Sequence, residues 1–445
     1  MPSVPAQVAT LIASTESPLA LDLLLLKIRS LLSYYSFNLV YFEADKLGNS
    51  KGDLMTGPLS GFKILDLSAV LSGPLATTWL CDQGAEVIKV ESFVGDVIRH
   101  AHNGTDGLTP AFVSSNRGKK GIALDLKSRA GIDIVKRMAL DVDVVIQNFR
   151  PGAIERMGLG YETLKDINPG LVYCSISGFG NKGPYTHKRI YDPIIQGLSG
   201  LNSIQGGPNG PPKMIRTLIP DVVTALTAAQ SITAALLSRE RTGKGQHVTV
   251  AMVDAVISLT WTSAMVGNML VDQLEARAAD RGDDLLFETA DGYITAAAVS
   301  ESEWHGLCRA LGREEWQEHE RLITTAGRTN NTDALSNLIS PILITKTSQH
   351  WLDLFDENGV PCGPVLTCAD LIHNEQIIAN ELIVVLDHPS LGKIRQSRPA
   401  ARFSGTPARI QGFAPRLGEH SRSILSQFSY SDEEIDALFA KGVIR

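Results

Sequence analysis

The alternation of short apolar runs with helical segments between residues 63 and 177 constrains the fold of this chain more than any other feature. Ile64 to Leu67 indicates a short buried strand, a helical run covers Leu75 to Asp82, and Glu86 to Glu91 indicates the next strand. A strand, a helix and a second strand within about thirty residues form a βαβ unit, whose strands are parallel and whose crossover is right-handed. Because the pattern recurs as far as Ser177, the sequence predicts an α/β protein with a doubly wound, Rossmann-like large domain.

Later parts of the chain predict a long core helix and a second domain. The chain has 445 residues, which is more than one hydrophobic core usually supports. Apolar residues recur at helical spacing after Pro220, with few charges before Arg239, and this indicates a buried helix. The pattern of predicted elements changes after residue 280, where Asp291-Gly292 predicts a hairpin turn and amphipathic helices follow. We therefore expect an N-terminal extension at 1–56, a large domain at 57–280, a smaller α+β domain at 281–390, and helices at 304–311, 349–355 and 432–440.

Charge and cysteine content exclude several classes of function. The chain carries 41 basic and 48 acidic residues, and its net charge of -7 argues against nucleic-acid binding, which requires a basic surface. Its five cysteines are odd in number and form no CxxC pair, so we expect neither a disulfide framework nor a metal site. Asp22, Lys27 and Arg29 interrupt the apolar stretch near the start, which predicts neither a membrane span nor a signal peptide. We expect a cytoplasmic protein that binds no membrane.

The turn after the first strand argues against a nicotinamide or flavin cofactor. Residues 68–74 contain a single glycine, Gly73, and no GxGxxG pattern. Without those glycines the backbone cannot approach a pyrophosphate as it does in dinucleotide-binding turns. Glu91, at the end of the second strand, is placed like a ribose-binding acid, but alone it does not define such a site.

Two arginines follow a predicted strand at the sheet edge where doubly wound domains bind ligands. Arg150 lies in the run Asn148-Phe149-Arg150-Pro151-Gly152, and Arg156 lies in the short helical segment that follows. Arginine binds phosphate through two parallel N–H groups, so either residue could hold a phosphorylated ligand. A plain helix start with exposed arginines explains the same pattern, and spacing alone favours that structural interpretation.

Asp221 follows Pro220 at the head of the predicted core helix. Aspartate is common as a helix cap, and spacing alone favours that structural role. The amino end of a helix also favours negative charge, so the carboxylate is expected to be ionised. An ionised carboxylate on a rigid element can act as a nucleophile in covalent catalysis.

Several sequence blocks resemble, in order, the class III CoA-transferase family from about Gly57 to Leu425. The opening blocks are Lys63-Ile64-Leu65-Asp66-Leu67-Ser68, Ser72-Gly73-Pro74, Gly84-Ala85-Glu86-Val87-Ile88-Lys89-Val90-Glu91 and Gly95-Asp96 with Arg99. The later blocks are Asn116-Arg117-Gly118-Lys119-Lys120, Asn148-Phe149-Arg150-Pro151-Gly152, Ser177-Gly178-Phe179-Gly180, Tyr191-Asp192, Gly243-Lys244-Gly245-Gln246, Val360-Pro361-Cys362-Gly363-Pro364 and Arg416-Leu417-Gly418-Glu419-His420.

The resemblance implies a fold, an assembly and a reaction. It implies an interlocked homodimer of ring-like chains, with a large domain that residues 391–445 rejoin. It implies transfer of CoA from an acyl-CoA thioester to a free carboxylic acid, without a cofactor beyond CoA itself. Asp221 takes the position of the family's nucleophile, which forms an aspartyl anhydride and then an aspartyl-CoA thioester. The implied CoA-binding residues are Val70, Ser72, Leu124, Lys127, Asn148, Phe149, Arg156, Met157, Arg189 and Tyr191.

Departures from the family pattern leave two alternative functions. Some relatives have glutamine where this chain has Leu71, and some have a basic residue at Ser92. The same fold hosts α-methylacyl-CoA racemases, in which a histidine stands at the position of Tyr191. Racemisation needs a second proton carrier, and tyrosine has an ordinary pKa of about 10, so the sequence favours the transferase. A catalytically silent relative that binds CoA is the third possibility, which an intact Asp221 disfavours.

Overall fold

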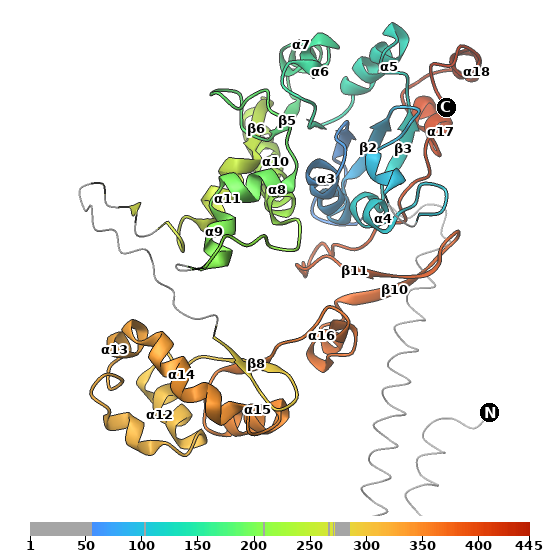
Figure 1. Cartoon of the computed structure of the whole chain (residues 1–445). Coiled ribbons are helices and arrows are strands. Elements are labelled where there is room, and N and C mark those ends of the chain that lie inside the picture. The colour runs from blue at the N-terminus through green and yellow to red at the C-terminus, as the bar shows by residue number, and fades with distance from the viewer. Residues whose placement is uncertain (1–55, 102–103, 208–209, 266–267, 270, 272–284) are drawn as a thin grey trace, which may run out of the picture.

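The computed structural model describes residues 56–101, 104–207, 210–265, 268–269, 271 and 285–445. The N-terminal extension predicted at 1–56 therefore lies almost entirely outside the described residues. Figure 1 shows a large α/β unit that contains the main sheet, and a group of helices, α12 to α15, that lies apart from it.

The main sheet has six parallel strands, as the βαβ pattern predicted. Their spatial order is β3 (Lys120–Ala123), β2 (Glu86–Glu91), β1 (Lys63–Asp66), β4 (Val144–Gln147), β5 (Val172–Ser177) and β6 (Gln246–Ala251). The order reverses between β1 and β4, and in open α/β sheets ligands bind outside the carboxyl ends of the strands at this point. The α/β prediction is confirmed.

Helices cover both faces of this sheet, so its strands are buried on both sides. One face packs against α3 (Ser72–Asp82), α8 (Asp192–Leu198), α10 (Ile219–Thr242) and α11 (Met252–Thr260). The other packs against α5 (Arg129–Ala139), α6 (Ala153–Arg156), α7 (Tyr161–Ile167), α17 (Ser421–Gln427) and α18 (Asp432–Ala440). Smaller elements are α4 (Pro110–Asn116), α9 (Leu201–Gly206) and a 3-10 turn at Val97–His100.

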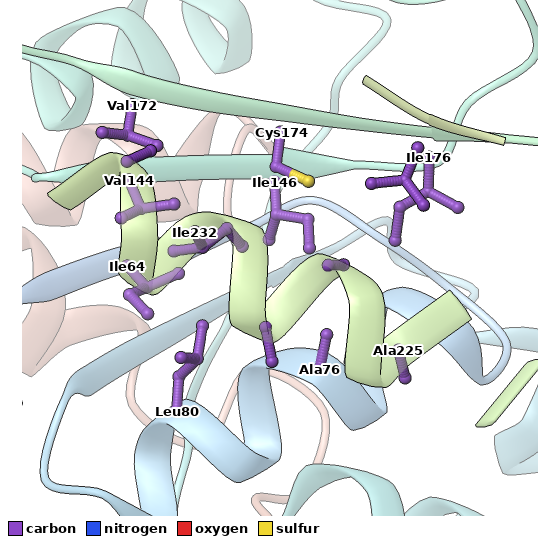
Figure 2. Close-up of a cluster of buried hydrophobic side chains, with 14 of the residues drawn as sticks. Ile64, Ala76, Leu80, Val144, Ile146, Val172, Cys174, Ile176, Ala225 and Ile232 are labelled. Atoms are coloured by element: carbon purple, nitrogen blue, oxygen red, sulfur yellow. The ribbon is translucent and has the colours of Figure 1, made fainter. Parts of the chain in front are cut away.

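The strand residues alternate between these two cores. Ile64 and Val144 belong to the core on the α10 side, whereas Leu65 and Val145 belong to the opposite core. Successive side chains of a strand point to opposite faces, which explains why each strand is an apolar run rather than a polar–apolar alternation. Figure 2 shows α10 crossing the strands, with Ile232 beside Val144 and Ile64.

Three predicted elements differ from the observed ones. The first helix begins at Ser72 rather than Leu75, because Pro74 in the first turn needs no amide partner. The third strand, which the sequence pattern predicts at Gly121 to Leu126, is observed at Lys120–Ala123, after which the chain turns into the start of α5. The interpretation of Asp221 as a helix cap is wrong, since α10 begins at Ile219 and its N-cap residue is Leu218.

The helix group around α12 has its own small sheet and its own core. Strands β7 (Leu286–Glu288) and β8 (Tyr293–Ala296) pair antiparallel, which confirms the hairpin at Asp291-Gly292. Their core draws only on residues between Phe287 and Cys362. The other elements are β9 (Cys362–Pro364), α12 (Glu301–Ala310), α13 (Thr325–Asn330), α14 (Thr332–Leu343), α15 (Ser348–Glu357), α16 (Glu375–Ala379), β10 (Ile383–His388) and β11 (Gly392–Ser397). The domain limits at 281 and 390 stay predictions.

The C-terminal segment packs against the edge strand β3. Leu124, just after β3, bridges to Ile444, and the amide of Arg445 donates to the carbonyl of Ala123 at 3.1 Å. The amide of His420 donates to the carbonyl of Gly121 at 2.9 Å. The predicted helix at 432–440 is confirmed as α18, with Ser431 and Glu434 forming a capping box at its start.

Among the described residues, α10 alone has the length and hydropathy that a membrane crossing would need. It packs against α3, β5 and β6 within the sheet's core. This packing accounts for the apolar residues on its buried face, such as Ala225, Ala228 and Ile232.

Candidate active site

Asp221 lies where the amino ends of α10 and α3 meet. It is in the first turn of α10, and the backbone and hydroxyl of Ser72, the first residue of α3, lie close enough to its carboxylate to lower its pKa. Ser72 is 4% exposed. The N-cap of α3 is Leu71, whose side chain supplies no acceptor, so no cap competes for these first-turn amides.

Burial dominates the electrostatics of Asp221. Burial raises the pKa of this carboxyl to about 6, the negative charge of Asp192 adds to the rise, and the hydrogen bonds from Ser72 oppose it. The helix end was expected to favour the ionised form, but desolvation outweighs it. Asp221 is therefore ionised above pH 6, yet it is a stronger base than an ordinary aspartate, as a nucleophile requires.

Asp192 is a second carboxylate beside Asp221 that sequence reasoning missed. It begins α8, is 3% exposed, and one of its oxygens accepts a hydrogen bond from the amide of Asp221 at 3.4 Å. Burial raises its pKa as well. The only sequence signal was its place in the Tyr191-Asp192 block of the family pattern.

Gln196 ties Asp192 to the segment that leads into α10. Its Nε2 donates to Asp192 at 2.7 Å and to the carbonyl of Ile215 at 3.2 Å, while its Oε1 accepts from the amide of Ile215 at 3.0 Å. Gln196 is buried. These bonds fix the approach of the chain to Asp221.

The turn between β1 and α3 runs from Ser68 to Ser72 and carries predicted site residues. Val70 has a φ of 69°, which is rare for a β-branched residue. Asn148, at the end of β4, accepts from the amide of Ala69 at 2.9 Å and donates to its carbonyl at 2.7 Å. A side chain at Gly73 would meet Ser68 at 2.3 Å, so only glycine permits the turn to fold back this closely.

A cavity of about 1160 Å³ opens outside the carboxyl ends of the central strands. Predicted CoA-binding residues line it from three elements or their neighbouring loops: Leu124, Lys127, Phe149, Arg156 and Met157. Ser68 and Ala69 of the β1–α3 turn also line it. A ligand in this cavity would therefore touch the same turn that presents Ser72 to Asp221.

The cavity has a cationic rim. Lys127, Lys136 and Arg156 line it, and none of them forms an ion pair with a described residue. Lys136 was not predicted, but Arg129, Ile132, Asp133 and Lys136 all line the cavity at helical spacing along α5. That spacing was a usable signal for one ligand-facing stripe of the helix. An anionic ligand suits such a rim.

Some predicted residues do not join this cavity. Arg189 and Tyr191 are exposed and do not line it, and Tyr191 is the N-cap residue of α8 with 72% of its surface exposed. Arg150 is exposed and lies outside the lining too. Of the two arginines considered as phosphate ligands, Arg156 lines the cavity and Arg150 does not.

Comparison with known proteins gives one consistent family. A model described as CoA-transferase family III matches residues 59–421. The succinyl-CoA:glutarate CoA-transferase of Mus musculus is 36% identical over 396 residues, which cover 87% of this chain and 90% of that protein. The succinyl-CoA–D-citramalate CoA-transferase of Chloroflexus aurantiacus is 33% identical and covers 87% of this chain and 98% of its own length.

A solved structure agrees with these sequence relatives. The crystal structure of a CAIB/BAIF family protein from Brucella suis superposes with a TM-score of 0.74 at 33% identity, covering 84% of this chain and 100% of that chain. Both the sequence and the α/β fold are thus similar to these relatives along most of the chain. The chain belongs to CoA-transferase family III.

Proposed function

We propose that this protein moves CoA from an acyl-CoA thioester to a free carboxylic acid, with Asp221 as the covalent nucleophile. The observation that supports this best is the half-buried carboxylate of Asp221, whose pKa is raised to about 6. It lies beside Ser72, at one end of the β1–α3 turn, and Ser68 and Ala69 at the other end of this turn line the large cavity. Ala69 and Ser72 are three residues apart, so at most about 11 Å of chain separates the two sites. Its relatives are named CoA-transferases, which supports the same reaction.

The reaction proceeds through two kinds of covalent intermediate on Asp221, a mixed anhydride and an aspartyl-CoA thioester. The Asp221 carboxylate attacks the thioester carbonyl of the donor, the C–S bond breaks, and a mixed anhydride and CoA thiolate result. The thiolate attacks the aspartyl carbonyl, which releases the donor acid and leaves an aspartyl-CoA thioester. The acceptor carboxylate attacks this thioester and expels CoA thiolate, which then attacks the acceptor's carbonyl and frees Asp221.

The cavity is the proposed place for the nucleotide end of CoA. Its volume of about 1160 Å³ exceeds the range of about 300–1,000 Å³ that small-molecule pockets usually have, as a ligand the size of CoA requires. Lys127 and Arg156 would hold phosphates, and Leu124, Phe149 and Met157 would contact the adenine. The flexible arm of CoA would then follow the β1–α3 turn toward Asp221.

The test is a transfer assay that also traps the intermediate. The protein is incubated with succinyl-CoA and either glutarate or D-citramalate, the substrates in the relatives' names, and new CoA thioesters are identified by mass. Hydroxylamine added with succinyl-CoA alone should convert Asp221 to a hydroxamate, visible in its peptide. A new thioester without any adduct at Asp221 would contradict the covalent mechanism.

A racemase is the weaker candidate on this site. Tyr191 replaces the histidine of the racemases and is largely exposed, whereas the residue in contact with Asp221 is the carboxylate Asp192. Two adjacent carboxylates do not provide the opposed acid and base that racemisation needs. A silent CoA-binding relative would bind CoA but give no hydroxamate in the same assay.

We also propose the interlocked homodimer that the family resemblance implies. Large apolar side chains are exposed on three helices that contact one another, α8, α10 and α11: Ile194, Leu198, Leu226, Leu237 and Leu259. A monomer seldom leaves so many large apolar residues in water, and a partner would cover them. Sedimentation over a hundredfold dilution should give a dimer throughout, because threaded chains cannot separate while folded. A folded monomer at low concentration would rule out the threaded assembly.

A further inference from the structure

We infer that Asp96 is a positioning residue for the reaction at Asp221. It holds Val70 in a left-handed backbone conformation and thereby fixes Ser72 against the nucleophile. This inference rests on the proposed function, because it assigns Asp96 a part in the work of Asp221.

Val70 is the strained point of the turn. Its φ of 69° is in the left-handed region, where a branched side chain on Cβ crowds the backbone. Such conformations persist only when surrounding groups impose them, and they gather at functional sites. Without a restraint, Val70 would relax to a negative φ, and the turn would carry Ser72 with it.

Asp96 supplies that restraint. The amide of Val70 donates to both carboxylate oxygens of Asp96, at 3.1 and 3.2 Å. The carboxylate also pairs with Lys89, 3.1 Å from Nζ to Oδ2, and the two side chains are 1% and 0% exposed. A hydrogen bond to an ionised, buried acceptor is roughly twice as strong as one between neutral groups.

The ion pair of Asp96 and Lys89 also holds the turn through Lys89. Lys89 Nζ donates to the carbonyl of Ser68 at 3.0 Å, two residues before Val70. Asp96 is itself held, because its amide donates to Glu91 at 2.8 Å, and Glu91 pairs with the buried Arg99 at 2.7 Å. Asp96 and Lys89, which together form a brace for the turn, are therefore fixed to β2 and do not move with the turn if it relaxes.

The brace matters for the chemistry through Ser72. Its backbone and hydroxyl lie beside the Asp221 carboxylate and favour the ionised form, and Ser72 is the residue at which the turn becomes the rigid helix α3. Asp221 loses its charge when it is acylated and regains it when the product leaves. Donors held in place through this cycle need no reorganisation, whereas a shift of about 1 Å can slow a reaction about a hundredfold.

The test is the Asp96→Asn variant, read as kcat and KM separately. Asparagine keeps the size but pairs poorly with Lys89 and presents a donor to the amide of Val70. We expect kcat to fall at least about tenfold, within the range that releasing such strain implies, while the KM for the acyl-CoA changes about threefold or less.

A second substitution separates positioning from general damage. Glycine adopts positive φ without penalty, so in the Val70→Gly background the Asp96→Asn change should cost kcat about threefold or less. The control is Asp143→Asn. Asp143 directly precedes β4, at the amino end of that strand, away from the cavity; it accepts from the amide of Lys63 at 2.6 Å and pairs with Arg239 at 2.8 Å. It should lower the melting temperature while kcat changes little.

The outcomes divide cleanly. A tenfold loss of kcat at Asp96 that the Val70→Gly background relieves supports the inference. An equal loss in both backgrounds, or a loss no larger than that of Asp143→Asn, overturns it. If Asp96→Asn alone does not fold, the comparison of Val70→Gly with the double variant decides in the same terms. Normal turnover by Asp221→Asn would instead overturn the proposed function, whatever Asp96 does.

Discussion

Asp221→Asn is expected to abolish CoA transfer and to raise the free energy of unfolding above pH 6. Asparagine has nearly the same shape but cannot form the anhydride, so turnover should fall at least about 10⁴-fold, as it does when other covalent nucleophiles are removed. The hydroxamate at this position should vanish with it. Transfer is measured by the mass of new CoA thioesters, and stability by denaturant unfolding at several pH values.

The gain in stability follows from the raised pKa. Burial takes the pKa of Asp221 from its ordinary 3.8 to about 6 in the folded protein. Between these values the folded state holds a proton that the unfolded state has lost, so the wild-type free energy of unfolding falls as pH rises through this window. Above pH 6 the full cost is present, up to about 3 kcal/mol at 1.36 kcal/mol per pKa unit, and this figure already includes the opposing effect of Ser72.

The matched control is Asp254→Asn, in the first turn of α11. Asp254 is also an aspartate in a helical first turn, but it is exposed. Its neutralisation should cost a few tenths of a kcal/mol through the helix dipole and leave transfer intact. If Asp221→Asn keeps near wild-type turnover, the covalent mechanism is wrong for this protein. If its stability falls with no pH dependence, the carboxylate is not a desolvated charge.

Arg156→Ala is expected to weaken the binding of free CoA about tenfold to a hundredfold. A hydrogen bond to a charged group contributes about 1.5–3 kcal/mol, and the low end of this range already corresponds to a tenfold change in the dissociation constant. Arg156 lies on the short helix α6 and lines the cavity. Calorimetric titration with CoA gives the affinity, and a thermal melt checks that the variant stays folded.

Arg150→Ala is the control for this change. It removes the same charge six residues earlier, from an exposed side chain outside the cavity lining. Its effect on CoA affinity should stay within about threefold and decline with added salt, since only long-range attraction is lost. Equal losses for the two variants would mean that the rim acts through net charge alone, and unchanged affinity for Arg156→Ala would remove it from the site.

The sequence was sufficient for the parts of the molecule that local chemistry determines. Apolar runs such as Ile64 to Leu67 predicted the parallel strands, because a strand buried on both faces has no polar side. Ser431 and Glu434 form a capping box, and the helix that follows them was predicted with its observed limits. The resemblance located Asp221, which spacing alone would have assigned to a cap.

The rest depends on distances between residues remote in sequence. The pKa of Asp221 is raised first by burial and then by the charge of Asp192, twenty-nine positions earlier. The left-handed conformation of Val70 could not be predicted, because the position holds neither glycine nor asparagine. It is imposed by the carboxylate of Asp96, twenty-six positions away. Arg189 and Tyr191 were assigned to the CoA site by resemblance alone, and in the described chain they are exposed outside the cavity.

The contacts at the edge of β3 have a consequence for how the protein is made. Residues emerge from the ribosome in order, so β3 is synthesised long before Ile444 and Arg445, which complete its hydrogen bonding. The helix group whose core draws on residues 287 to 362 is contiguous and can collapse first. Until the C-terminal residues are synthesised, the large unit has an unpaired strand edge at β3 and an incomplete core, and this state is prone to aggregation. Slow growth or chaperone supply during expression should therefore raise the yield of this protein more than stabilising the helix group would.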